Sequence, residues 1–233
     1  MNISPKDLKQ VVVFQHATDE DLSLILKNSI TRSIEEGGFF FLQGDDAKHL
    51  YILTSGQVKL MQSNPNGQQV NLRTIYPWQM FGALGAVRMD MPTYPATAQT
   101  LEDSTALAVP SLFLRSMLET RPYLSFDLMT LMTSYIQEMQ ARYRELATEK
   151  VEQRVANALV RLAGQSGLRS NKEAGIELSF SRQDVAEMTG STLYTISRLL
   201  SEWERRGILK TGREKIIILQ PHELVRIADG QEK

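Results

Sequence analysis

The chain contains no cysteine. This absence excludes disulfides, thiolate metal sites, iron–sulfur clusters held by cysteine, and a cysteine nucleophile. Histidine is scarce as well, because His16, His49 and His222 are the only three, and their spacing offers no metal-binding pair. A phosphate-binding P-loop and a Gly-x-Ser-x-Gly nucleophile motif are also missing from the sequence. These absences together predict a protein that is not an enzyme.

Long apolar runs are absent too. No stretch approaches the roughly 20 residues that a helix needs to cross a bilayer, and the first residues do not resemble a signal peptide. We therefore expect no membrane association and a cytoplasmic location. The net charge is −1, but from residue 149 onward fourteen Lys and Arg stand against twelve Asp and Glu. This small positive excess is compatible with a nucleic-acid partner but does not by itself indicate one.

Between residues 34 and 109, short apolar runs alternate with glycine-containing segments, a pattern typical of β-structure. The runs lie at residues 39–42, 50–53, 58–61 and 70–75. Asn66-Gly67 between the last two predicts a tight hairpin turn, because both residue types tolerate a positive φ. Strands this short and regularly spaced favour a β-barrel or β-roll.

A helical pattern follows between residues 122 and 146, with apolar residues mostly three or four positions apart and no glycine, and no proline after Pro122. This stripe suits a helix that pairs with a copy of itself, although a helix that packs on its own domain would give a similar pattern. The predicted dimer contacts are Leu124, Leu128, Leu131, Met132, Tyr135 and Met139, and the stripe continues to Tyr143 and Leu146.

The segment 181–209 predicts a helix-turn-helix. Ser181 with Asp184 forms a capping box that opens a short helix, and Gly190 permits a sharp turn. Ser191 or Thr192 caps a second helix, which Gly207 closes. The apolar runs around residues 208–210 and 215–219 flank a turn with a basic residue, which predicts a β-hairpin wing. The alternatives are an ordinary helix pair in a core, or a helix-turn-helix that docks on protein.

An α-helix fits the major groove of B-DNA, so the exposed residues of the second helix are the candidates for base recognition. Arg198 can bridge O6 and N7 of guanine with two hydrogen bonds. The other polar side chains are expected to contact phosphates. The candidate DNA-binding residues are Arg182, Thr192, Tyr194, Thr195, Ser197 and Arg198.

Two regions of the chain resemble the CRP/FNR family of bacterial transcription regulators. The N-terminal match comprises Gly44-Asp45, Leu50 to Leu53, Ser55-Gly56, Val58 and Phe81-Gly82. The C-terminal match comprises Ser181 to Ala186 and Thr195 to Leu200. The resemblance implies an α+β chain in which residues 1–121 form a β-roll sensor of the cyclic-nucleotide-binding type, a jelly roll. Residues 122–148 would form a long dimerisation helix, and residues 149–233 a winged helix-turn-helix.

The resemblance also implies a homodimer on palindromic double-stranded DNA, a signal received in the β-roll, and contact with RNA polymerase. Carried over by position, Arg198 would contact guanine, and Arg182, Thr192 and Thr195 would contact the DNA backbone. Tyr194 departs from the family, whose members commonly have Glu there as an acceptor for cytosine N4. The half-site that this chain recognises is therefore left open.

The effector site departs from the cyclic-AMP-binding members of the family. Those members use a Glu after the Phe-Gly pair and an Arg-Ser pair further on, whereas this chain has Ala83, Thr93 and Tyr94. Met139 and Gln140 stand where those relatives contact the base. We therefore predict that cyclic AMP is not the effector. The predicted pocket residues are Phe81, Gly82, Ala83, Leu84, Thr93, Tyr94 and Met139.

Other signals remain open at this point. Residues 92–99 are more similar to the FNR and nitric-oxide-responsive members than to the cyclic-AMP members, which makes haem a candidate. Haem needs an axial ligand, for which the histidines, a methionine or a tyrosine are available. A small metabolite such as an organic acid, or control by protein abundance alone, are the alternatives.

Overall fold

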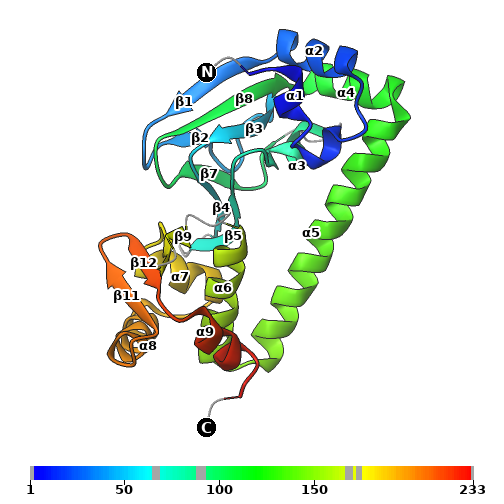
Figure 1. The fold of residues 1–233 in the computed structure, drawn as a ribbon. Helices are drawn as coiled ribbons and strands as arrows, with labels where there is room; N and C mark the ends of the chain where they lie inside the picture. Colours follow the sequence, from blue (N-terminus) through cyan, green and yellow to red (C-terminus); the bar gives the residue numbers. More distant parts are fainter. Residues whose placement is uncertain (1–2, 65–68, 88–92, 166–169, 172–174, 232–233) are drawn as a thin grey trace. The chain divides into compact units, whose positions relative to one another are not determined.

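The computed structural model describes residues 3–64, 69–87, 93–165, 170–171 and 175–231. The chain forms two compact units, and the division falls within the helix α5 (Pro122–Thr148) (Figure 1). Unit 1 comprises Met1–Gln68 and Leu72–Met139, and unit 2 comprises Gln69–Asn71 and Gln140–Lys233. The predicted Asn66-Gly67 turn lies outside the described residues.

Two four-stranded sheets make up the β-structure of unit 1, which confirms the predicted β-rich domain. The first has the order β1-β8-β3-β6, with β1 Ile30–Ile34, β8 Ser104–Pro110, β3 His49–Ser55 and β6 Met80–Phe81. The second has the order β2-β7-β4-β5, with β2 Phe39–Phe41, β7 Thr97–Thr100, β4 Val58–Ser63 and β5 Gln69–Ile75. The first three residues of β5 are grouped with unit 2. The pairs β1·β8, β3·β8, β3·β6, β2·β7 and β4·β7 are antiparallel.

The centre of strand β3, Leu50 to Leu53, is continuously apolar because both faces of the strand are buried there. Leu50 and Ile52 belong to a core with the N-terminal helices, and Tyr51 and Leu53 belong to the core inside the β-structure. Tyr51 lies opposite Ala108 of β8, so a large ring faces a small side chain. A strand buried on two sides loses the apolar-polar alternation of a half-exposed strand, which accounts for its continuous run.

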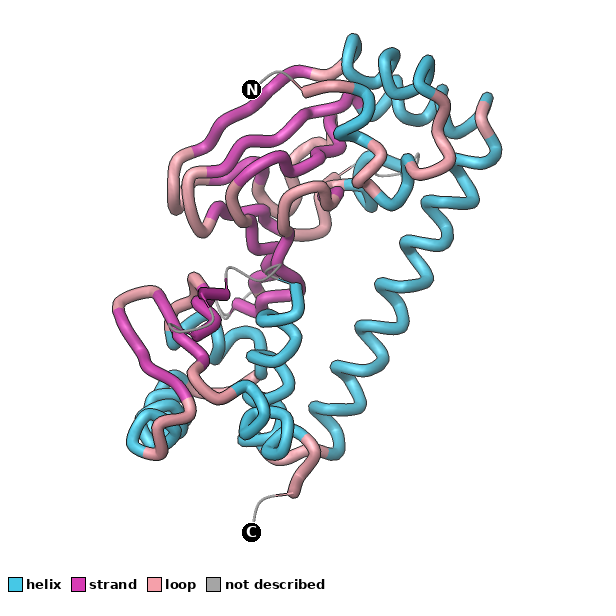
Figure 2. Tube along the Cα trace, in the orientation of Figure 1, coloured by secondary structure: helices cyan, strands magenta, loops and turns pink. Residues whose placement is uncertain are grey.

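Helices gather at one end of the strands of unit 1 (Figures 1 and 2). They are α1 (Pro5–Leu8), the 3₁₀-helix η1 (Val12–Phe14), α2 (Asp19–Asn28), α3 (Ala83–Val87) and α4 (Ser111–Thr120). Phe14, Leu22 and Met117 from these helices are at most 2% exposed and pack with Val109 of β8. The β-rich pattern of the sequence does not predict these helices.

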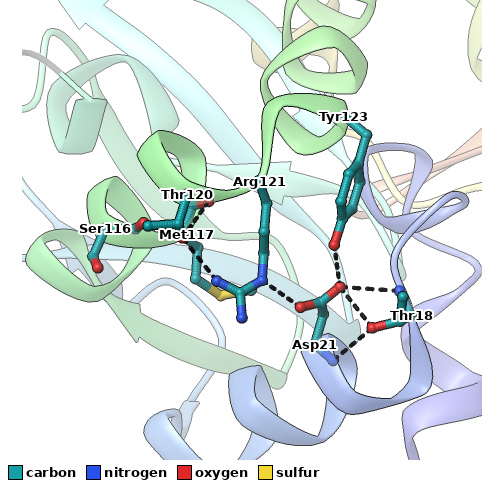
Figure 3. A network of polar contacts seen from close by, with 7 residues as sticks. All are labelled: Thr18, Asp21, Ser116, Met117, Thr120, Arg121 and Tyr123. Atoms are coloured by element: carbon teal, nitrogen blue, oxygen red, sulfur yellow. Dashed lines mark hydrogen bonds and ion pairs between the residues drawn. The ribbon is translucent and has the colours of Figure 1, made fainter.

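A buried carboxylate fastens α2 to the junction between α4 and α5 (Figure 3). Asp21 is 3% exposed and accepts hydrogen bonds from the backbone N–H of Thr18 at 3.1 Å and from its hydroxyl at 2.7 Å. The guanidinium of Arg121 and the hydroxyl of Tyr123 donate to the same carboxylate. Burial alone would raise the pKa of Asp21, but the bonds from Tyr123, Thr18 and Arg121 outweigh it and lower the pKa to about 2.

We expect Asp21→Asn to lower the free energy of unfolding of the protein by about 2 kcal/mol at pH 7. Because the pKa is lower in the folded state, the stabilisation by Asp21 is complete above the unfolded value near 4. It is lost as pH falls toward the folded value of about 2. Urea unfolding of both chains between pH 7 and pH 3, followed by circular dichroism, measures the difference.

The matched control for this prediction is Asp19→Asn, which removes a carboxylate from the same first turn of α2. The Asp19 side chain is 75% exposed and lies 3.4 Å from Lys9, so its ion pair contributes little. A stability difference between wild type and Asp21→Asn that stays constant down to pH 3 would contradict the role assigned to the carboxylate.

Unit 2 combines helices with one small sheet (Figure 2). Its helices are α6 (Val151–Gln165), α7 (Arg182–Thr189), α8 (Leu193–Arg205) and α9 (Pro221–Ala228), together with the end of α5. The sheet has the order β11-β12-β10-β9, with β11 Leu209–Gly212, β12 Lys215–Ile218, β10 Gly175–Leu178 and β9 Ser170–Asn171. Its fully buried side chains include Val155, Leu159, Val185, Ile196, Leu200, Trp203 and Leu224.

Candidate nucleic-acid interface and dimer face

Helices α7 and α8 form the predicted helix-turn-helix. Asp184 accepts hydrogen bonds from the Ser181 N–H at 2.9 Å and from the Ser181 hydroxyl at 2.6 Å, which confirms the capping box. Gly190 ends α7 with φ 60°, in the left-handed region that favours glycine. Thr192 then caps α8, since its hydroxyl oxygen accepts a hydrogen bond from the Thr195 N–H at 3.2 Å.

Helix α8 has one buried face and one exposed face. Ile196, Leu200 and Trp203 are 0% exposed and hold the helix against unit 2. On the other side, Arg198 is exposed, together with Leu193 at 47% and Tyr194 at 78%. A helix held by one face and free on the other has the arrangement that entry into a DNA groove requires.

The polar residues predicted to contact DNA lie on α7, on α8 and at the cap of α8. Some of their side chains are already held by hydrogen bonds within the chain. Thr192 and Thr195 share a hydrogen bond between their hydroxyls at 2.9 Å, and Ser197 is partly exposed. Arg182 donates from Nη2 to the Thr211 hydroxyl of β11 at 2.9 Å. Arg182 therefore fastens α7 to β11.

Strands β11 and β12 form the predicted hairpin, with Gly212 opposite Lys215 across the turn Arg213-Glu214. Glu204 of α8 accepts from the Thr211 N–H at 3.0 Å and from its hydroxyl at 3.2 Å. These bonds, with the charges of Arg182 and Lys210, lower the pKa of Glu204. Lys210, Arg213 and Lys215 are all exposed, so the hairpin presents three positively charged side chains to solvent, of which Lys215 lies 3.6 Å from Glu177.

Helix α5 carries an exposed apolar seam with heptad spacing. The seam residues are Met129, Met132, Ile136, Met139, Tyr143 and Leu146, separated by alternating steps of three and four residues. Five of them are exposed large side chains, between 53% for Leu146 and 75% for Tyr143, and Met132 is partly exposed. Alternating three- and four-residue steps of apolar side chains are typical of two helices that pack along their length.

The predicted dimer stripe combines two faces of α5. Leu124 is 1% exposed within the core of its own unit, and Leu128 and Leu131 pack against that core. Tyr135 lies under the guanidinium of Arg73 from β5, with the ring centre 3.9 Å from the guanidinium carbon. These four residues serve the chain's own fold, so among the predicted contacts only Met132 and Met139 lie on the exposed seam.

The predicted effector residues divide in a similar way. Phe81, Ala83 and Tyr94 are buried, and the Tyr94 ring stacks on Phe41 with the ring centres 3.7 Å apart. The Tyr94 hydroxyl donates to the His49 carbonyl oxygen at 2.6 Å. Gly82 has φ 78°, in the left-handed region that favours glycine, and a Cβ there would lie 3.1 Å from the Tyr94 ring. Thr93 is partly buried, Leu84 is 59% exposed, and Met139 belongs to the exposed seam.

The three histidines are not gathered into one site. The side chains of His16 and His222 are each 72% exposed, and each lies beside a carboxylate, of Asp127 at 3.0 Å and Glu223 at 3.7 Å. His49 is partly buried on β3. Across the described ranges, no three His, Asp or Glu side chains converge as metal ligands. The described helices also include none with the length and apolar character of a membrane span.

Both units of the chain are similar to known protein families. The family model for the cyclic nucleotide-binding domain matches residues 31–121, and that for the Crp-like helix-turn-helix domain matches residues 153–227. The transcriptional activator protein Anr of Pseudomonas aeruginosa is 28% identical over 200 residues, which cover 86% of this chain and 81% of the relative. A CRP-like cAMP-activated global transcriptional regulator of Mycobacterium tuberculosis is 24% identical over 221 residues, covering 95% and 98%.

The fold also matches a solved structure. FixK2 from Bradyrhizobium japonicum superimposes with a TM-score of 0.73 at 18% identity, covering 85% of this chain and 96% of that one. At this identity the likeness concerns the fold alone.

Proposed function

Because this chain belongs to the CRP/FNR family of DNA-binding transcription regulators, we propose that it binds double-stranded DNA as a homodimer through two copies of α8. Its relatives are transcription regulators, and the chain is a regulator of this type rather than an enzyme. The observation that carries the proposal is the exposed face of α8 with Arg198, on a helix whose opposite face is fully buried.

The dimer is supported by the exposed seam of α5. Exposed apolar side chains at heptad positions are stabilised when they pack against the same positions of a second copy. Two-fold symmetry then places two recognition helices about 34 Å apart, one turn of the duplex, so the site is a palindrome. In this arrangement Arg198 contacts guanine, while Arg182, Thr192, Thr195 and Ser197 contact the DNA backbone. Arg182 also holds β11 in place.

The experiment is a selection of preferred duplexes from a random pool, followed by fluorescence anisotropy on the selected site at several salt concentrations. Lysines and arginines that neutralise phosphates release counterions, so the affinity falls steeply as salt rises. We expect the selected site to be a palindrome. We also expect the protein to bind it with higher affinity than a scrambled duplex of equal composition. Equal affinity for both duplexes at every salt concentration would contradict sequence-specific binding.

We also propose that cyclic AMP does not regulate the chain. The Tyr94 side chain is buried and stacked on Phe41 beside Gly82, and Ala83 cannot accept a hydrogen bond from a ribose hydroxyl through its side chain. We therefore expect calorimetric titration with cyclic AMP to give no binding heat at micromolar concentrations, whereas a measurable micromolar affinity would contradict the proposal.

The identity of the effector, the contact with RNA polymerase, the cellular location and the domain boundaries stay predictions. For haem, His49 on β3 is partly buried whereas His16 and His222 are exposed, and haem stays one candidate signal. A small organic acid is the alternative effector. Contact with RNA polymerase, the cytoplasmic location, and the boundaries 1–121, 122–148 and 149–233 rest on the likeness to the family.

A further inference from the structure

The first turn of α8 presents two large apolar side chains to solvent. Leu193 is 47% exposed and Tyr194 is 78% exposed, and they directly follow the cap residue Thr192. They stand at the N-terminal end of the helix, the end that contacts base edges when such a helix enters the major groove. Apolar surface at this place is stabilised only when a partner with apolar surface covers it.

The floor of the major groove carries one apolar group, the 5-methyl of thymine. The other groups on the base edges there are hydrogen-bond donors and acceptors. A leucine has no hydrogen-bonding side-chain atom, so it distinguishes bases through this methyl group or not at all. Tyrosine adds a flat ring that can cover the same methyl while its hydroxyl stays in water.

We propose that Leu193 and Tyr194 select thymine through its methyl group, next to the guanine that Arg198 contacts. Tyr194 and Arg198 are four residues apart, so they lie on the same face of α8, about 6 Å apart along its axis. Base pairs are stacked about 3.4 Å apart, so the selected thymine lies one or two base pairs from the guanine. This inference rests on the proposed DNA binding of α8.

The test replaces each thymine of the selected site by uracil, which lacks the methyl and keeps every hydrogen-bonding group. With the full-length protein, we expect one or two positions in each half-site where uracil weakens binding about fourfold, as for loss of one buried methyl contact. Leu193→Ala or Tyr194→Ala should remove this penalty at its own position. Tyr194→Phe should keep it, because the ring remains.

The matched control is Leu219→Ala, which removes an exposed leucine of unit 2 outside α8, 37% exposed in the wild type. This variant should keep the full difference between thymine and uracil. Neither Leu193 nor Tyr194 belongs to the buried core, so we expect each variant to fold as the wild type does. Circular dichroism of each variant checks this.

Two results would overturn the inference. One is binding that is unaffected by uracil at every position of the site, and the other is a uracil penalty that is unchanged in Leu193→Ala and Tyr194→Ala. In both cases salt-dependent binding to the palindrome would persist, so the proposed function would stand. A chain without any preference for the selected duplex would instead overturn the proposed function itself.

Discussion

A chain carrying Ile136→Glu is expected to be monomeric and to lose about a thousandfold or more of its affinity for the palindromic duplex. Ile136 is 56% exposed at the centre of the α5 seam, between Met132 and Met139. In a pair of α5 helices related by two-fold symmetry, the two glutamates would face each other in an apolar interface. Burying unpaired like charges costs several kcal/mol, and a monomer contacts one half-site only.

Sedimentation equilibrium measures the oligomeric state, and fluorescence anisotropy measures the affinity for the duplex. The matched control is Gln137→Glu, which adds the same charge at an exposed neighbouring position outside the seam and should leave both measurements near wild type. Circular dichroism should be equal for the two variants. A dimeric Ile136→Glu chain with unchanged DNA affinity would show that another surface joins the protomers.

The helix-turn-helix could be predicted closely from the sequence because its signals are local. The capping box of Ser181 and Asp184, the left-handed Gly190 and the cap Thr192 each act within four residues, and the structure has all three. The hairpin of β11 and β12 followed in the same way from two apolar runs around a short turn. Interactions between near neighbours are visible in sequence without knowledge of the fold.

Which apolar face of α5 stays exposed could not be predicted, because apolar residues occur on two faces of the helix. Leu124, Leu128, Leu131 and Tyr135 repeat at steps of three and four residues, and so do the seam residues. Both sets satisfy the helical period, and only the three-dimensional fold shows that the first set is occupied by the core of unit 1 and by Arg73. Periodicity identifies an apolar face but not what covers it.

The contact of Asp21 with Arg121 was missed for a different reason. The two residues are 100 positions apart, and nothing local to either one indicates the other. A signal for helix α2 was present, since Thr18 and Asp21 have the spacing of a capping box, as Ser181 and Asp184 do. The capping-box spacing that indicates the start of α7 also indicates the start of α2, but not the ion pair that the Asp21 carboxylate makes.

Arg198→Ala is expected to lower affinity for the selected palindrome about ten- to hundredfold for each half-site and to change binding to random duplex little. A guanidinium that bridges O6 and N7 of guanine contributes about 1–3 kcal/mol of discrimination. Arg198 is exposed on α8 beyond the first turn, on the same side as Tyr194 and away from buried Ile196 and Leu200, so alanine should leave the fold intact. Anisotropy on the selected, scrambled and guanine-substituted duplexes measures the effect.

The control for Arg198→Ala is Arg205→Ala, which removes an exposed arginine from the last turn of the same helix. Both variants lose one positive charge, so a purely electrostatic role predicts equal losses on every duplex and an equal change in salt dependence. A base contact instead predicts that Arg198→Ala alone becomes indifferent to replacement of the guanine. Equal loss on cognate and random duplex for Arg198→Ala would assign the residue to the DNA backbone and leave base recognition to the first turn of α8.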